Sequence, residues 1–326
     1  MIDIKIEIKN AGYLLNINGK EFRSPVIFDV KSLKEKNKIE NYLISKGIKY
    51  RILVKEKPFK LSQLKYKFGY IKDRIDERDY SFKTVLSSKL STTPMIKDYT
   101  SLMSPVKDQR NAGTCVGFAV AAVKEYQEQQ EYLSEKKSGS KYERKEKHYD
   151  LSEQWIYYKS KEIDPWPNQE GTSIRDALKQ LCKLGVPPEK GWLYNDIIKG
   201  KPEVWAKSIA RWGKGQEYYR INNLNELLTA LTNVGPVVIG ILCFEEIMNP
   251  QKGLVKYPIN PNRCYGGHAI TCVGFSKKTK LIKFKNSWSR NWGDNGYGYL
   301  PFKYIEDYMI DAWALIDINI KNIMRG

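Results

Sequence analysis

The sequence predicts an α+β protein in which a small N-terminal module precedes a larger domain. Three observations support this prediction: alternating apolar residues at the N-terminus, helically spaced apolar residues after about residue 99, and short apolar runs toward the C-terminus. With 326 residues, the chain is long enough for two domains and a sizeable buried core. We place the module at 1–68, a linker at 69–93 and the larger domain at 94–326.

The N-terminal module is itself predicted to be α+β. Isoleucines alternate with charged residues over 2–8, as in a half-buried strand, and the turn signal Asn10-Ala-Gly12 favours a hairpin with the strand that follows. The predicted strands span 2–8, 13–18, 24–30 and 48–54, with a helix between Ser32 and Gly47. The module contains neither Cys nor His, so we expect an accessory domain with a protein partner.

The larger domain is predicted to be helical in its first half and strand-rich in its second. The predicted helices span 115–133, 152–160 and 172–184, and the predicted strands span 237–244, 268–275, 281–287, 298–302 and 314–320. The linker before it is too polar for a core and too aromatic for a free tether. We therefore expect its aromatic residues to dock on the larger domain.

Composition excludes several classes of function. The formal charge is +18, but the excess is mostly lysine spread along the whole chain, so we do not expect a nucleic-acid partner. The longest apolar run, 237–244, is too short to span a membrane, and the N-terminus lacks the apolar core of a secretory signal. Five scattered cysteines and two histidines argue against a disulfide scaffold, a metal site or any cofactor.

Cys115 has the sequence context of a nucleophile. It opens a helical pattern, where the helix dipole and unpaired backbone N–H groups favour a thiolate. Gly113 lets the chain approach a substrate closely just before it. Gln109, on the preceding turn, offers a side-chain NH₂ as an oxyanion donor beside the Cys115 N–H. Taken alone, a cysteine at this position is more often a small buried hydrophobic residue.

Two later segments supply the partners that a cysteine nucleophile requires. His268 stands at the start of a predicted strand and can serve as the general base, and Asn286 ends the next strand and can orient the imidazole. Trp288 can shield the hydrogen bond between them from water. The other histidine, His148, lies beside a lysine-rich loop and is expected to be a surface residue.

These residues resemble the papain family of cysteine peptidases over roughly residues 94–316. His268 follows Cys115 by 153 residues and Asn286 follows it by 171, close to the spacing in that family. Four ordered segments carry the resemblance: Pro105-Val-Lys-Asp-Gln109 with Gly113-Thr-Cys115, Leu151-Ser-Glu-Gln154, His268-Ala-Ile270, and Lys285-Asn-Ser-Trp288. The resemblance implies a two-lobed domain, with a helical lobe and an antiparallel β lobe.

The resemblance also implies roles for individual residues. Cys115 is then the nucleophile, His268 the base and acid, Asn286 its orienting partner and Gln109 the oxyanion donor. Gly171 is similar to the glycine-rich edge that binds an extended substrate backbone, and with Trp288 it is predicted to contact substrate.

The chain departs from the family at two linked positions. Ala112 and Lys159 stand where the family commonly has the two halves of a disulfide. Because both halves are missing together, we expect a reducing compartment, the cytoplasm.

The sequence therefore predicts a thiol endopeptidase that acts on protein or peptide substrates. We expect linker residues 69–93 to lie along the cleft and block it, as in a zymogen. Three alternatives remain at this point: a catalytically silent papain-like binding protein, another Cys–His acyl-transfer enzyme such as a transglutaminase or amidase, and a module at 1–68 that binds nucleic acid or an anionic surface.

Overall fold

The computed structural model divides the chain into two compact units, residues 1–64 and residues 65–326. It describes residues 3–8, 14–17, 20–23, 26–30, 39, 41–43, 45–46, 48, 51–55, 66–74, 76–85, 92–139, 148–195, 200–261 and 263–317. The larger unit begins at Lys65, whereas the sequence predicts a boundary after residue 68. Tyr66 and its neighbours thus belong to the same compact body as Cys115.

The smaller unit contains two antiparallel sheets among its described residues. The strands are β1 (Asp3–Ile8), β2 (Leu14–Ile17), β3 (Lys20–Arg23), β4 (Val26–Val30) and β5 (Arg51–Lys55). One sheet has the order β4-β1-β5, and β2 pairs with β3 alone. Ile39 and Leu43 are buried, whereas most of the predicted helix between Ser32 and Gly47 lies outside the described residues.

The predicted hairpin between the first two strands is wrong. β2 pairs with β3, and β1 pairs instead with β4 and β5. In the observed register Ile17 opposes Lys20, which leaves the two residues Asn18-Gly19 between the strands. Asn-Gly is a stronger signal for a two-residue hairpin than the Asn10-Ala-Gly12 turn on which the prediction rested.

The larger unit contains both helices and strands. Its strands are β6 (Ile96–Asp98), β7 (Glu217–Ile221), β8 (Val237–Cys243), β9 (Gly266–Ser276), β10 (Leu281–Lys285), β11 (Tyr297–Pro301) and β12 (Met309–Ile316), and its α-helices are α2 (Cys115–Lys137), α3 (Glu153–Lys161), α4 (Ile174–Leu184), α5 (Ala206–Ile209), α6 (Leu224–Asn233) and α7 (Phe302–Tyr308). Short 3-10 helices lie at Phe82–Val85, Thr100–Leu102, Glu189–Gly191, Ala210–Gly213, Glu245–Ile247 and Gln251–Gly253.

The helices begin where capping residues stand. Ser152 accepts a hydrogen bond from the Trp155 N–H and starts α3, and Ser173 does the same for α4 through the Asp176 N–H. Both starts agree with the predicted helices to within two residues. The predicted helix at Cys115 is confirmed and runs four residues further than expected, to Lys137.

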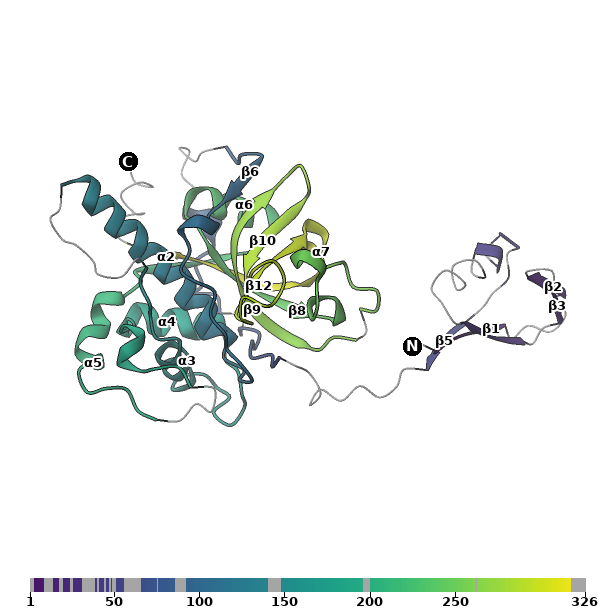
Figure 1. Ribbon diagram of the computed structural model, residues 1–326, viewed down its shortest axis with the longest axis horizontal. Helices are drawn as coiled ribbons and strands as arrows, with labels where there is room; N and C mark the ends of the chain where they lie inside the picture. The colour runs from purple at the N-terminus through teal and green to yellow at the C-terminus, as the bar shows by residue number, and fades with distance from the viewer. Residues whose placement is uncertain are drawn as a thin grey trace. The chain divides into compact units, whose positions relative to one another are not determined.

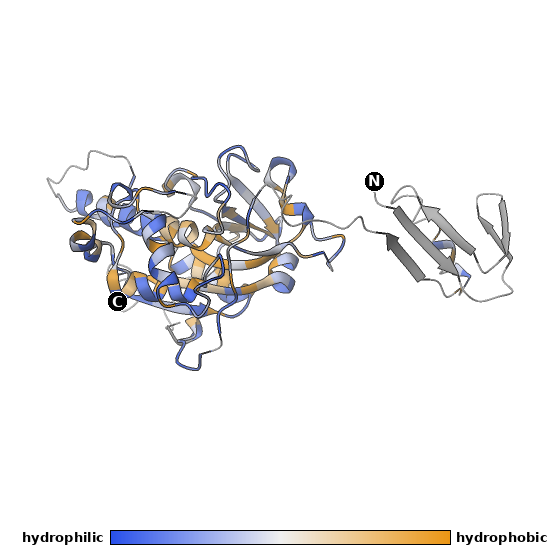
Figure 2. Cartoon of the chain, turned by 90° about the horizontal axis from the view of Figure 1, so that it is seen from below, coloured by the Kyte–Doolittle hydropathy of each residue, from blue (hydrophilic) through white to orange (hydrophobic). Residues whose placement is uncertain are grey.

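The two-lobed α+β architecture is confirmed. One antiparallel sheet has the order β11-β10-β9-β8-β12-β7, with β6 added beside β9. Helices α3, α4 and α5 lie together on one side, the sheet lies on the other, and α2 runs between them (Figure 1). Apolar segments gather in the interior, and hydrophilic ones cover the outer helices (Figure 2).

The sheet contributes to the apolar cores of both lobes. In β8, Val238 packs with the helices around Trp155, whereas its neighbour Ile239 packs with Phe284 on the other face. Successive strand side chains point to opposite faces, so one strand supplies both cores. Between the cores, the Thr271 hydroxyl of β9 donates to the Ala119 carbonyl of α2 at 3.0 Å. This fixes the helix that carries Cys115 against the strand that carries His268.

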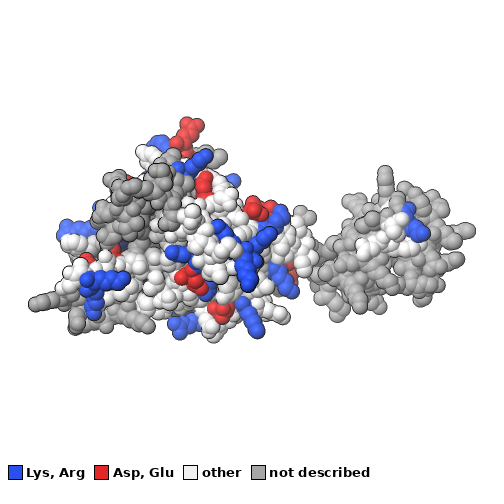
Figure 3. Space-filling view, turned by 90° about the horizontal axis from the view of Figure 1, so that it is seen from above, with Lys and Arg blue, Asp and Glu red and all other residues white. Residues whose placement is uncertain are grey.

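Charged and uncharged residues alternate on the face of the described part of the chain that Figure 3 shows. Lys and Arg side chains on one face stand between acidic and uncharged residues (Figure 3). Among the described residues, none of the helices is long and apolar enough to cross a membrane.

Candidate active site

Cys115 is the first residue of α2 and is fully buried. Its N–H belongs to the first helical turn, where no intrahelical acceptor is available. The Sγ atom accepts a hydrogen bond from the Ala269 N–H at 3.4 Å, and the backbone N–H of Gly69 also points at it. The sulfur therefore lies between the helix start, strand β9 and the segment that contains Gly69.

His268 lies in β9 and is held by Asn286, which directly follows β10. The distance from His268 Nε2 to Asn286 Oδ1 is 2.8 Å, and the same oxygen accepts from the Ser287 N–H at 2.8 Å. Because Oδ1 can only accept, Nε2 carries the ring proton and Nδ1 is the unprotonated nitrogen. His268 Nδ1 makes no hydrogen bond within the described part of the chain. It is therefore the ring nitrogen available to take a proton from a thiol.

Trp288 covers this hydrogen-bonded pair. Its ring stacks on His268 with centroids 4.5 Å apart and an interplanar angle of 25°, and it is fully buried. On its other partner, Tyr66, it stacks at 4.3 Å with an angle of 1°. Trp288 therefore lies where the sequence predicts a shield for the bond between His268 and Asn286. Its indole also binds an aromatic side chain, that of Tyr66.

Gln109 has its side-chain amide fixed in one orientation. Its Oε1 accepts from the Ser287 hydroxyl at 2.6 Å, so the NH₂ group points the other way. There Nε2 donates to the Ala112 carbonyl at 2.7 Å and to the Lys67 carbonyl at 3.1 Å. The NH₂ group that is predicted to bind the oxyanion is therefore already hydrogen-bonded to the Lys67 carbonyl oxygen.

Residues 66–73 pair with the residues around Cys115 like an added strand. The Thr172 N–H donates to the Gly69 carbonyl at 2.9 Å, and the Ile71 N–H donates to the Thr172 carbonyl at 3.0 Å. The Tyr70 N–H donates to the Gly267 carbonyl, next to His268, at 3.1 Å. The bridge between Tyr70 and Thr172 is parallel. The backbone of this segment therefore pairs with Thr172 and with Gly267, and it covers the Cys115 thiol.

Gly171 makes room for this pairing. Its φ is +100°, and a Cβ there would lie 2.6 Å from the Gly69 carbonyl oxygen. Its own N–H donates to the Tyr157 hydroxyl at 3.0 Å. Thr172, which the sequence analysis did not single out, makes the edge hydrogen bonds in this structure. The only sequence signal for Thr172 is its position directly after Gly171, which is similar to the substrate-binding glycine of the family.

The side chain of Tyr70 fills a buried pocket beside the thiol. Gly240 and Gly267 wall it, since a Cβ on either would come within 2.6 Å of the Tyr70 side chain. At the pocket floor the Tyr70 hydroxyl donates to Asp311 Oδ2 at 2.6 Å. Burial, and next the neighbouring Asp73, hold the pKa of Asp311 well above its usual range, which favours the protonated carboxyl.

Asp73 anchors the end of the segment. Its Oδ1 accepts from the Arg175 N–H at 3.2 Å, and its Oδ2 accepts from the Trp313 indole N–H at 2.9 Å. Further on, Asp79 pairs with Arg175 at 2.6 Å and Arg220 at 3.0 Å. These partners lie far apart in the sequence, and no local motif linked them.

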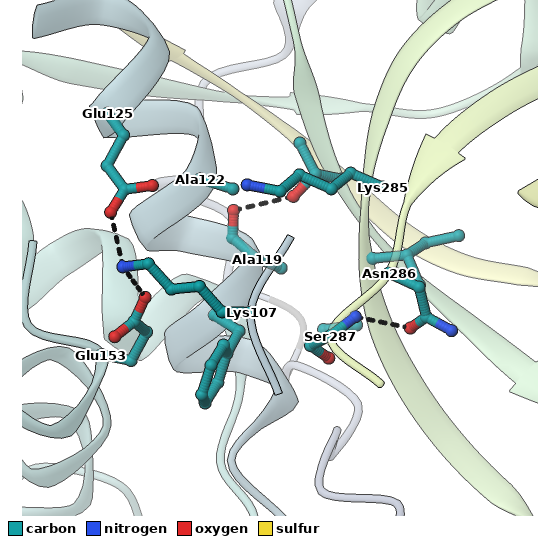
Figure 4. A pocket seen from close by; sticks show the side chains of 12 residues that line it. Lys107, Ala119, Ala122, Glu125, Glu153, Lys285, Asn286 and Ser287 are labelled. Carbon is teal, nitrogen blue, oxygen red and sulfur yellow. Dashed lines mark hydrogen bonds and ion pairs between the residues drawn. The ribbon is translucent and has the colours of Figure 1, made fainter. Parts of the chain in front are cut away.

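A buried charged cluster includes Glu125 of the nucleophile helix α2 (Figure 4). Lys107 points between Glu125 and Glu153 and pairs with both, at 2.8 Å to Glu125. Lys285, next to Asn286, donates to the Ser104 hydroxyl at 2.8 Å, and that hydroxyl donates to Glu125. Burial lowers the pKa of Lys285 to about 8 and raises the pKa of Glu153 to about 7. The cluster links both lobes directly beside Asn286.

The described residues contain no group of three or more His, Cys, Asp or Glu side chains that could hold a metal ion. Their five cysteines are all free.

Burial controls the ionisation of the thiol and the imidazole. It raises the pKa of Cys115 to about 11, although the N–H groups of Ala269, Gly69, Val116 and Cys115 itself act in the opposite direction. It lowers the pKa of His268 to about 4, with Asn286 opposing. The helix start favours a thiolate as the sequence suggested, but loss of water outweighs it. Both shifts favour the uncharged forms, a neutral thiol and a neutral imidazole.

Cys115, an imidazole fixed by an asparagine and a preceding glutamine amide are the residue types that a cysteine hydrolase of the acyl-enzyme type requires. The family model of papain family cysteine protease matches residues 95–312. The chain therefore belongs to the papain family of cysteine proteases.

Comparison with individual proteins agrees with this assignment. The chain is 28% identical to an uncharacterised peptidase C1-like protein of Acanthamoeba polyphaga mimivirus, over 79% of this chain and 89% of the viral one. Xylellain, a cysteine protease from Xylella fastidiosa, is similar in structure, with a TM-score of 0.66 and 28% identity over 78% of this chain and 97% of xylellain. Digestive procathepsin L 3 of Tenebrio molitor shares the fold, with a TM-score of 0.55 and 21% identity over 71% of this chain and 72% of that one.

The shifted pKa values predict how Cys115 reacts in the full-length chain. A buried acid has its pKa raised and a buried base has its pKa lowered, so we expect no ion pair between Cys115 and His268 between about pH 4 and pH 11. The thiolate fraction should then rise about tenfold per pH unit through the neutral range. The ultraviolet absorbance of the thiolate, taken as the difference between the full-length chain and its Cys115→Ala variant, reports this ionisation without opening the segment, and no thiolate signal should be present between about pH 5 and pH 8. A thiolate signal in that range would contradict the prediction.

Proposed function

We propose that this chain is a thiol endopeptidase that hydrolyses peptide bonds through a thioester on Cys115. The observation that carries the proposal is that hydrogen bonds hold the candidate base, its orienting group and the candidate oxyanion donor in fixed positions around Cys115. Ala269 brings β9 against Cys115 Sγ, His268 is fixed by Asn286 at 2.8 Å, and the Gln109 amide is aimed by Ser287. General base, orienting group and oxyanion donor are thus held by hydrogen bonds before substrate arrives.

The proposed reaction proceeds in two halves. His268 Nδ1 takes the thiol proton, and the sulfur of Cys115 attacks the carbonyl carbon of the scissile bond. Gln109 Nε2 and the Cys115 N–H donate to the oxyanion. His268 then gives its proton to the leaving amine, the C–N bond breaks and the thioester remains. Water, deprotonated by His268, attacks the thioester, and the C–S bond breaks to release the acid.

We further propose that residues 66–73 keep the full-length chain inactive. Three contacts support this. Gly69 presents its N–H, and not a carbonyl carbon, to the sulfur. The Lys67 carbonyl accepts the hydrogen bond of Gln109 Nε2, the proposed oxyanion donor, and Tyr66 stacks on Trp288. A sulfur that faces an N–H group has no electrophile to attack. The segment therefore acts as a blocker rather than a substrate, and it begins slightly before the linker that the sequence indicated.

The unit formed by residues 1–64 is proposed to be an accessory domain with a protein partner. No residue of the catalytic set lies in it, and its sequence contains neither Cys nor His. Removing it leaves residues 66–73 in place, so its loss alone should not start hydrolysis.

Peptide cleavage tests the proposed reaction, in the Tyr70→Ala background described below so that the site is open. Cys115→Ala should abolish hydrolysis. Gln109→Ala should stay folded and lower turnover by about 10²–10³, because one oxyanion donor is lost. Mass spectrometry of products from a peptide library should show water added across the cleaved bond. Products carrying a transferred acyl group, or cleavage that survives Cys115→Ala, would contradict the proposal.

Loosening the segment tests the proposed block. Tyr70→Ala removes a buried ring and its hydrogen bond to Asp311, and truncating a buried aromatic residue costs about 3–5 kcal/mol. Peptide hydrolysis by the full-length variant should therefore rise at least about tenfold. Tyr80→Ala, whose side chain is 71% exposed, is the matched control and should change nothing.

Deletion of residues 1–64 provides the second control, because it keeps the segment and should leave activity low. If Tyr70→Ala is no more active than the parent chain while remaining folded by circular dichroism, the block is elsewhere or absent.

A further inference from the structure

Glu170 places a carboxylate against the turn that leads to the nucleophile. Its Oε1 accepts a hydrogen bond from the Gly113 N–H at 2.7 Å, two residues before Cys115. The contact is close, since a Cβ on Gly113 would lie 3.0 Å from Glu170 Cγ. Glu170 directly precedes Gly171, at the edge that pairs with residues 66–73. The catalytic set makes no use of this carboxylate.

Lys67 connects that carboxylate to the oxyanion donor. Its Nζ lies 3.1 Å from Glu170 Oε2, and its own carbonyl accepts from Gln109 Nε2 at 3.1 Å. One residue therefore presents its carbonyl to the oxyanion position and its ammonium group to Glu170. A lysine whose carbonyl lies at Gln109 Nε2 can therefore reach Glu170 with its side chain.

We propose that Glu170 is a specificity-determining residue, which selects Lys or Arg at the substrate residue that contributes the scissile carbonyl. The proposal rests on the proposed peptidase function, in which that carbonyl binds at Gln109. A substrate with a basic residue there can place its cation on Glu170 as Lys67 does. A glutamate at the same position would meet a like charge.

The size of the effect follows from the exposure of the pair. The side chains of Lys67 and Glu170 are 47% and 40% exposed, so water screens their attraction. Exposed ion pairs of this kind correspond to about a two- to fivefold preference. Reversing the charge of the substrate residue should cost a similar factor, so Lys and Glu substrates should differ by roughly tenfold.

Matched probes on the full-length chain test the selection. Three peptidyl acyloxymethyl ketones that differ only in the residue next to the ketone, with lysine, norleucine or glutamate, are compared by the rate at which they label Cys115. The wild-type chain should react in the order lysine, norleucine, glutamate. Ratios between probes within one protein cancel any change in how far the segment opens.

Two variants of Glu170 separate its charge from its contact with Gly113. Glu170→Gln keeps an oxygen that can accept from the Gly113 N–H and should make the lysine and norleucine probes equal. Glu170→Lys should place the glutamate probe first. If Glu170→Gln slows all three probes by the same factor, or leaves their order unchanged, Glu170 is structural and the proposal is overturned.

A charge swap measured with iodoacetamide separates this proposal from the proposed function. Lys67→Glu should raise the alkylation rate of Cys115 in the full-length chain severalfold, and adding Glu170→Lys should restore the slow rate. Absence of that restoration overturns the selection by Glu170 whether or not peptides are cleaved. Restoration together with an absence of peptide hydrolysis in the Tyr70→Ala background would instead overturn the proposed function.

Discussion

The state of this active site depends on the burial of Cys115 and His268 beneath residues 66–70. Both groups lose water, and the loss disfavours the thiolate and the imidazolium alike. The backbone N–H groups around the sulfur are arranged as a thiolate would require, yet they do not outweigh burial. Access of water or substrate to the sulfur is therefore coupled to its ionisation, because both require the same segment to leave.

Two polar clusters hold the site. In the first, Lys107 pairs with Glu125 and Glu153. Lys285 joins this cluster beside Asn286 through the Ser104 hydroxyl, which donates to Glu125. In the second, the Tyr70 hydroxyl and the Asp73 N–H donate to Asp311 and anchor the covering segment. A buried polar or charged group that loses its partner is destabilised, so each cluster fixes its elements in one position. The first cluster positions the catalytic side chains, and the second positions the segment that covers them.

Much of the larger unit could be predicted from sequence because its signals are local. Ser152 and Ser173 mark helix starts by capping, and the apolar runs of β8, β9 and β10 match their burial. The candidate catalytic residues were recognisable because histidine is scarce and Cys115 stands at a helix start.

The contacts that cover the site could not be predicted in this way. Tyr70 and Asp311 are separated by 241 positions, and no periodic pattern reports such a contact. Asp311 also interrupts an apolar run, so the last strand was expected from 314, whereas β12 begins at Met309. Its burial makes sense only once the Tyr70 hydroxyl and Asp73 are in place. Helix α6, from Leu224 to Asn233, was missed although Asn223 caps it.

The protonation state of His268 in the full-length chain tests the central claim most directly. Because the chain has two histidines, the ¹⁵N chemical shifts of His268 can be assigned by comparison with a His148→Gln variant. At pH 7 the account predicts a neutral ring protonated on Nε2, and no titration until the pH falls to about 4. An imidazolium signal at pH 7 that disappears in Cys115→Ala would show a preformed ion pair and contradict the account.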